Sequence, residues 1–155
     1  MISKNSVDKV SRRLEDVFSE MDEAWKSVSS LRLKVATLRS KEHKLVTSIR
    51  SLRREIRAYK REWTKFSKLL EGVTHEPYRK DLLEIIQINK VEKEIAANRL
   101  AWRERRLESM RVKMESTSAE VNALDDRLDE LTDSRNLIIR SLTACVSEEA
   151  VLNCG

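Results

Sequence analysis

The sequence predicts an all-α protein, a single long antiparallel two-helix coiled-coil hairpin. Charged residues make up 37% of the 155 residues and aromatic residues only 5%. Two glycines and one proline leave few places for turns, so the chain should contain few and long elements. Hydrophobic residues, at 40%, are too many for a disordered chain. The chain should therefore fold around a thin core, as a coiled coil does.

The first helix is predicted over residues 6–71. From Val7 to Val73, twenty positions follow one another at alternating spacings of three and four residues, and nineteen of them are apolar. Glu42 is the exception. This spacing places the apolar side chains on one narrow face, which predicts a left-handed supercoil with a partner helix.

The turn is predicted at residues 72–77, the one credible point of chain reversal. Gly72 suits the left-handed conformation that often follows a helix, and Thr74 can cap the next helix. Pro77 fits in the first turn of that helix, because the N–H that proline lacks would have no partner there.

The second helix is predicted over residues 78–144. From Leu107 to Cys145 the alternating spacing returns, and ten of its twelve positions are apolar. Between Leu82 and Trp102 the apolar residues are too many for one narrow face. Either the supercoil changes phase there, or a second face of the helix is apolar.

A short turn predicts antiparallel packing, with the numbers of facing residues adding up to about 149. Val28 and Val121 should then lie close together. The same register places Glu42 near Arg103 and Arg106. Glu42 is either a tolerated core defect that reaches solvent or a member of an ion pair that fixes the register.

The sequence contains no glycine-rich phosphate loop and no metal-ligand spacing, so we expect neither an enzyme nor a cofactor. His43 and His75 are isolated, and both are expected to be solvated structural residues. Cys145 and Cys154 fall in a C-terminal tail, residues 145–155, that is expected to be flexible. A reduced and chemically idle pair is predicted there.

Charge is distributed unevenly along the predicted hairpin. Residues 26–68 carry fourteen Lys or Arg against three Glu, whereas residues near both termini are acidic. Basic surfaces bind nucleic acid weakly and without specificity, but no recognition element accompanies this one, so no specific nucleic acid is expected. No apolar run is long enough to enter a bilayer and no signal-peptide pattern is present, which predicts a cytoplasmic protein.

The residues after the turn are predicted to bind a protein partner. Six apolar residues fall between positions 82 and 91, whereas a two-helix contact needs about two per heptad. Some of these should face solvent and mark an interface. The alternatives are local broadening of the core by Trp63 and Phe66, or packing between hairpin tips. The predicted site consists of Tyr78, Leu82, Leu83, Ile85 and Ile88.

The hairpin architecture and the segment YRKDLLEIIQINKV, residues 78–91, resemble the central stalk proteins of bacterial type III secretion systems, the family of YscO, InvI/SpaM and the flagellar FliJ. The resemblance implies a cytoplasmic stalk, similar to the γ subunit of rotary ATPases. Its paired termini would enter the hexameric export ATPase, and its turn would face the cytoplasmic domain of the export gate. Secretion chaperones are further implied partners, and these partners would bring the chain to the inner-membrane apparatus.

The tail after Leu142 matches nothing in that family. Two alternatives to a secretion stalk remain open from the sequence. One is a structural or tethering coiled coil of another assembly. The other is a basic hairpin that binds nucleic acid.

Overall fold

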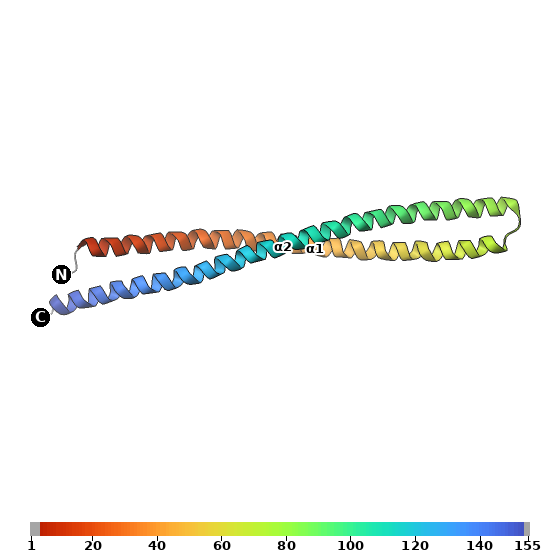
Figure 1. Cartoon of the computed structure of the whole chain (residues 1–155). Coiled ribbons are helices and arrows are strands. Elements are labelled where there is room, and N and C mark those ends of the chain that lie inside the picture. The colour runs from red at the N-terminus through yellow and green to blue at the C-terminus, as the bar shows by residue number, and fades with distance from the viewer. Residues whose placement is uncertain (1–3, 154–155) are drawn as a thin grey trace. The chain divides into compact units, whose positions relative to one another are not determined.

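The computed structural model describes residues 4–153, and the side chains of these as far as residue 147. It contains two α-helices, α1 (Lys4–Gly72) and α2 (Glu76–Asn153), joined by three residues (Figure 1). The helices pack against each other in opposite directions, and the part of the chain described contains no strand. The prediction of an all-α, antiparallel two-helix hairpin is confirmed.

α2 continues past the end that the sequence analysis expected. It was predicted to stop near residue 144 and to give way to a flexible tail, but the helix continues to Asn153. Residues 145–153 contain no glycine or proline and include Ala, Glu and Leu, which favour helix. The last two residues of the predicted tail, including Cys154, lie outside the described part of the chain.

The turn differs from its prediction in two details. Gly72 is the last residue of α1 and does not have a positive φ, so it is not a left-handed cap. The first backbone hydrogen bond of α2 runs from the N–H of Arg79 to the carbonyl of His75, at 3.0 Å. His75, rather than Thr74, therefore occupies the capping position. Pro77 lies in the first turn of α2, as predicted.

Arg79 connects the two ends of the turn. Its Nη1 lies 3.5 Å from the carbonyl oxygens of both Leu70 and Val73. These oxygens belong to the last turn of α1 and the residue after it, where carbonyls lack partners within the helix. A guanidinium group there also interacts favourably with the negative end of the helix dipole.

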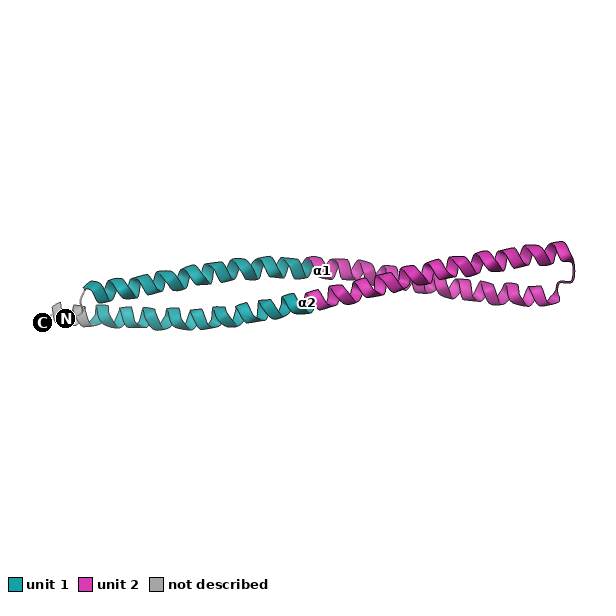
Figure 2. Cartoon of the chain, turned by 45° about the horizontal axis from the view of Figure 1, so that its top comes forward, with its two compact units in different colours: residues 1–36, 115–155 teal, residues 37–114 magenta. Residues whose placement is uncertain are grey.

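The chain divides into two compact units (Figure 2). Unit 1 comprises Met1–Ala36 and Glu115–Gly155, and unit 2 comprises Thr37–Met114. Each unit contains a segment of α1 and a segment of α2, and unit 2 includes the turn.

The core of unit 1 is built from apolar side chains of both helices. Val28 is completely buried and packs in one cluster with Ala24, Val121 and Leu128. The predicted proximity of Val28 and Val121 is confirmed. Three partly buried residues surround this cluster, namely Met21, Leu31 and Leu124.

In unit 2, α2 keeps the same alternating spacing on the face that it turns towards α1. Asn89 is buried there, and Lys93 and Arg103 are half-buried. Polar residues therefore occupy some of the inward positions that are usually apolar in a coiled coil. Because the inward spacing is unbroken, the supercoil does not change phase in this part of α2. The inward positions are Leu82, Ile86, Asn89, Lys93, Ala96, Leu100, Arg103, Leu107 and Met110.

Candidate protein-binding surface

The predicted turn-end site separates into inward and outward residues. Leu82 is half-buried, at one of the positions that α2 turns towards α1. The other four side chains are exposed, from 41% for Ile85 to 65% for Tyr78. Ile85 and Ile88 are three residues apart and share one face of α2. Leu83 lies on the opposite flank, because two residues of helix turn the chain by about 200°.

The exposed apolar face extends beyond the predicted residues. Ile88 is 58% exposed, Ile95 47% and Trp102 53%, and each lies seven residues from the next. Seven residues make about two helical turns, so the three side chains lie in one line along α2. We call Ile85, Ile88, Ile95 and Trp102 the outer stripe. Val91, also exposed, lies beside it.

The apolar count after the turn is thereby explained. Of the two residues that could broaden the core there, Trp63 is 48% exposed and Phe66 is half-buried. The predicted residues did not include Ile95 and Trp102, which continue the exposed face. The signal for them is the inward spacing extended back from Leu107, which places Ala96 and Leu100 inward and hence Ile95 outward.

The beginning of α2 offers a second surface feature. The rings of His75 and Tyr78 lie 5.6 Å apart at an angle of 50°. Leu83 and the first turns of α2 line a hollow of about 490 Å³. Besides Leu83, the hollow is lined by Glu76, Pro77, Arg79 and Lys80.

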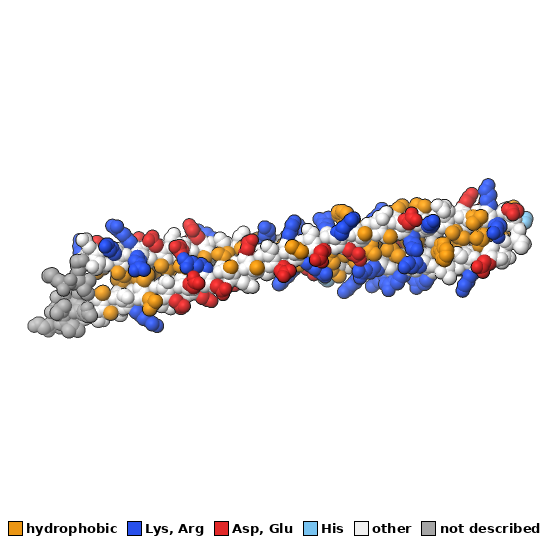
Figure 3. Space-filling model, viewed as in Figure 1, with side chains coloured by type: hydrophobic (Ala, Val, Ile, Leu, Met, Phe, Trp, Pro, Cys, Tyr) orange, Lys and Arg blue, Asp and Glu red, His pale blue; other side chains and the backbone are white. Residues whose placement is uncertain are grey.

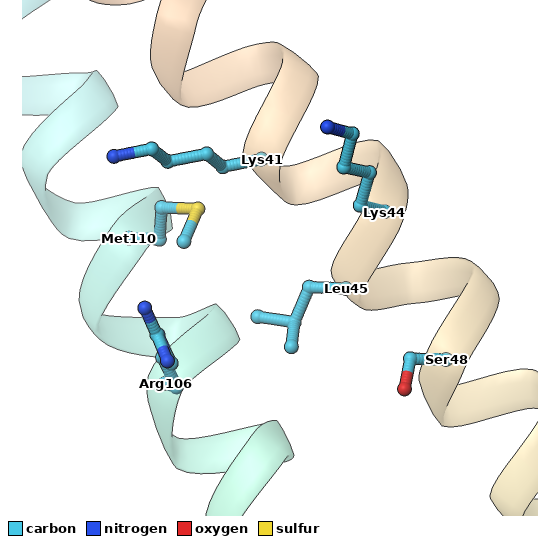
Figure 4. A pocket seen from close by; sticks show the side chains of 6 residues that line it. All are labelled: Lys41, Lys44, Leu45, Ser48, Arg106 and Met110. Carbon is cyan, nitrogen blue, oxygen red and sulfur yellow. The ribbon is translucent and has the colours of Figure 1, made fainter.

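The far end of the outer stripe is basic. The guanidinium carbon of Arg106 lies 5.3 Å from the centre of the Trp102 ring, within the range of a cation–π contact. Arg106 also lines a hollow of about 280 Å³ between the helices, together with Lys41 and Lys44. Figure 4 shows the side chain of Lys41 extending from α1 across Met110 of α2. The apolar lining comes from Leu45 and Met110.

The near end of the outer stripe is acidic. Tyr59 donates a hydrogen bond to Glu55 at 3.1 Å, and Asn89 donates one to Glu62 at 3.2 Å. The pKa of Tyr59 is raised, first by desolvation, then by the hydrogen bond to Glu55 and by the negative charges of Glu55, Glu92 and Glu62. Three carboxylates thus gather around this tyrosine.

The structure pairs Glu42 with Arg111, five residues beyond Arg106 and eight beyond Arg103, so neither predicted partner is correct. Arg111 Nε lies 3.7 Å from Glu42 Oε1, whereas Arg103 lies on the inward face of α2 and Arg106 covers Trp102. The register predicted from the turn has facing residue numbers that add up to about 149, whereas in unit 2 the paired residues add up to 153 for Glu42 with Arg111 and to 157 for Arg53 with Glu104. Glu42 therefore forms an ion pair, one of the two alternatives that the sequence left open, and its partner is Arg111.

Glu42→Leu should raise the stability of unit 2 slightly. The Glu42 side chain is 26% exposed and its ion pair with Arg111 is long, at 3.7 Å. An apolar side chain at this position should therefore raise the free energy of unfolding by about 1 kcal/mol or less. Thermal melting followed by circular dichroism measures the change. Glu108→Leu, at an exposed position of α2, is the control and should not gain. A Glu42→Leu protein that melts below the parent would show that the ion pair outweighs apolar packing.

Other ion pairs flank the core on both sides. In unit 2, Arg53 pairs with Glu104 at 2.9 Å. In unit 1, Arg127 Nη2 lies 3.0 Å from Glu20, and Arg127 Nη1 lies 3.0 Å from Glu130. The pKa of Arg127 is raised by its hydrogen bonds, the larger contribution coming from Glu130. Such exposed pairs select the orientation of two helices more than they stabilise them.

The two units differ in charge. Unit 2 carries 21 Lys or Arg and 11 Asp or Glu, a formal charge of +10, whereas unit 1 carries 10 and 15, a formal charge of −5. Figure 3 shows Lys and Arg side chains crowded along the part of α1 that belongs to unit 2. Several exposed members form no ion pair within the described residues, among them Arg50, Arg54, Arg57, Arg61 and Lys68.

Across residues 4–153, neither helix has an apolar stretch long enough to span a bilayer. Within the same range, no three His, Cys, Asp or Glu side chains are grouped as metal ligands would be. Cys145 is a half-buried free thiol. Comparison with models of known protein families, with curated proteins and with solved structures finds no match to this chain.

Proposed function

We propose that this chain is a non-enzymatic coiled-coil stalk of a bacterial type III secretion export apparatus, which acts by binding other proteins. The observation that carries the protein-binding part is the exposed apolar surface near the turn, on Tyr78, Ile85 and Ile88. Side chains of this kind are costly to expose and usually mark an interface. The assignment to a secretion stalk comes from the resemblance of residues 78–91 and of the hairpin architecture.

In this role the chain links two partners. The turn end binds the cytoplasmic domain of the export gate, and the paired ends of α1 and α2 bind the hexameric export ATPase. The opposite formal charges of the two units support two dissimilar partners, because complementary charge steers association. Secretion chaperones are additional candidates, and the chain would reach the inner membrane only through its partners.

The test is a double substitution, Leu83→Ser with Ile88→Ser. Both side chains are about half exposed, so the melting temperature should stay within a few degrees of the parent. Binding to the purified cytoplasmic domain of the export gate should fall at least tenfold, measured by isothermal titration calorimetry. The matched control is Leu33→Ser with Val112→Ser, which alters two other exposed apolar side chains and should leave binding intact.

Two results would contradict the proposal. If the parent chain binds neither the export gate domain nor the export ATPase, the stalk assignment fails. A pull-down from native cells that returns a different assembly would then favour a structural or tethering coiled coil. If the double variant binds like the parent, the turn-end surface is not the binding site.

A further inference from the structure

We infer that the outer stripe binds one amphipathic α-helix of a partner protein, with basic residues at one end of that helix and acidic residues at the other. The inference deepens the proposed function, on which it rests, by naming the kind of element that occupies the surface. It extends the site from the turn end to Trp102. It uses contacts within unit 2 only.

The spacing of the stripe fits a helix. α2 turns one set of residues towards α1 and holds Ile88, Ile95 and Trp102 in a second line, at intervals of about 10.5 Å. A partner helix with apolar residues in a seven-residue repeat presents side chains at this same interval. An extended strand presents its side chains at about 6.7 Å on one face, which does not match. The stripe therefore selects a helical partner.

The charges along the stripe change sign near Ile95. Glu92 lies between Ile88 and Ile95 on the helix surface, four residues after the first and three before the second. Arg99 has the same relation to Ile95 and Trp102. The half of the outer stripe before Ile95 is therefore flanked by an acidic residue, and the half after Ile95 by a basic one.

Side chains of α1 add negative charge to the acidic end of the outer stripe and positive charge to its basic end. Glu55 and Glu62 gather with Glu92 around Tyr59. Lys41 and Lys44 join Arg106 in the hollow beside Trp102. A partner helix therefore needs Lys or Arg over residues 85–92 and Asp or Glu over residues 99–106, which fixes its direction once its sequence is known.

A second copy of this chain is a weaker occupant. Two stripes in antiparallel contact would match acidic ends with basic ends. They would also bring together two units that each carry a formal charge of +10, and like charge opposes such association. A different protein that lacks this excess of positive charge meets no such opposition.

The experiment replaces Ile88, Ile95 and Trp102, one at a time, by a photo-cross-linking amino acid in the full chain, within cells that naturally produce it. Mass spectrometry then locates the attachment points. We expect all three on one segment of one partner, about seven residues apart, because both helices rise about 1.5 Å per residue. Val112, an exposed apolar residue of α2 off the stripe, is the control position and should not cross-link to that segment.

Each other outcome overturns the inference. Attachment points about three residues apart would indicate an extended strand, since a strand covers about 10.5 Å in roughly three residues. Attachment to a second copy would make the stripe a self-association surface. Scattered attachment points, or none, would show that no ordered helix lies there.

A charge reversal tests the direction of the partner helix. Arg99→Glu with Arg106→Glu should reduce capture of the cross-linked partner at least tenfold, whereas Lys90→Glu with Arg140→Glu changes the same charge elsewhere on α2 and should not. Failure of this inference is separable from failure of the proposed function. The spacing of attachment points identifies a helix whichever protein supplies it, and the identity of that protein decides the stalk assignment.

Discussion

Val28→Asp should unfold much of unit 1. The Val28 side chain is 0% exposed and contacts the apolar cluster of both helices. An aspartate there removes apolar packing and places a carboxylate among the apolar side chains of this cluster. We expect a loss of about 3–5 kcal/mol, the usual cost of an uncompensated buried charge. Circular dichroism at 25 °C should show a large loss of helical signal.

Leu33→Asp is the matched control on the same helix. Leu33 is 70% exposed, so the substitution introduces the same charge but removes little packing. Its cost should stay below about 1 kcal/mol. Equal melting curves for the two variants would show that Val28 is not at the centre of a core.

Asn89→Leu should have the largest effect in the stabilising direction. Asn89 is 4% exposed, donates a hydrogen bond to Glu62, and has a side-chain oxygen with no hydrogen-bond partner among the described residues. A leucine at this inward position avoids the cost of a desolvated carbonyl and adds apolar contact. We expect a gain of about 1–2 kcal/mol in the free energy of unfolding, measured by denaturant titration.

The same substitution should reduce structural specificity. A single buried asparagine in a coiled coil often fixes register and oligomeric state at a cost in stability. Light scattering should therefore detect additional oligomers of the Asn89→Leu protein. Asn98→Leu, at an exposed position of the same helix, should show neither effect. A destabilised Asn89→Leu protein would mean that the asparagine contributes more than its visible hydrogen bond.

The sequence was sufficient to predict the hairpin, because the apolar spacing of α1 is almost unbroken and one Gly–Pro segment divides the chain. It was insufficient in the first third of α2. There Asn89 and Lys93 look like surface residues yet lie inward, whereas Ile88 and Ile95 look like core residues yet lie outward. Polarity alone cannot assign a face when a helix carries two apolar lines.

The register between the two helices also could not be predicted from the sequence. An offset of a few residues between two helices depends on how the turn closes, and Arg79 takes part in that closure through contacts that no pattern shows. The sequence left Glu42 open between a tolerated core defect and an ion pair with Arg103 or Arg106, and the structure pairs it with a different arginine. Its partner, Arg111, could only be found from the coordinates.

The three-residue connection between α1 and α2 has a consequence for the order of folding. Contacts near the turn, such as Glu62 with Asn89, join residues 27 positions apart, whereas Glu20 and Arg127 are 107 positions apart. Closing the longer loop first would cost about 1.2 kcal/mol more in chain entropy. Helix pairing should accordingly begin beside the turn and advance towards the termini, each paired layer shortening the loop that the next must close, in an order that pulse-labelled hydrogen exchange can record.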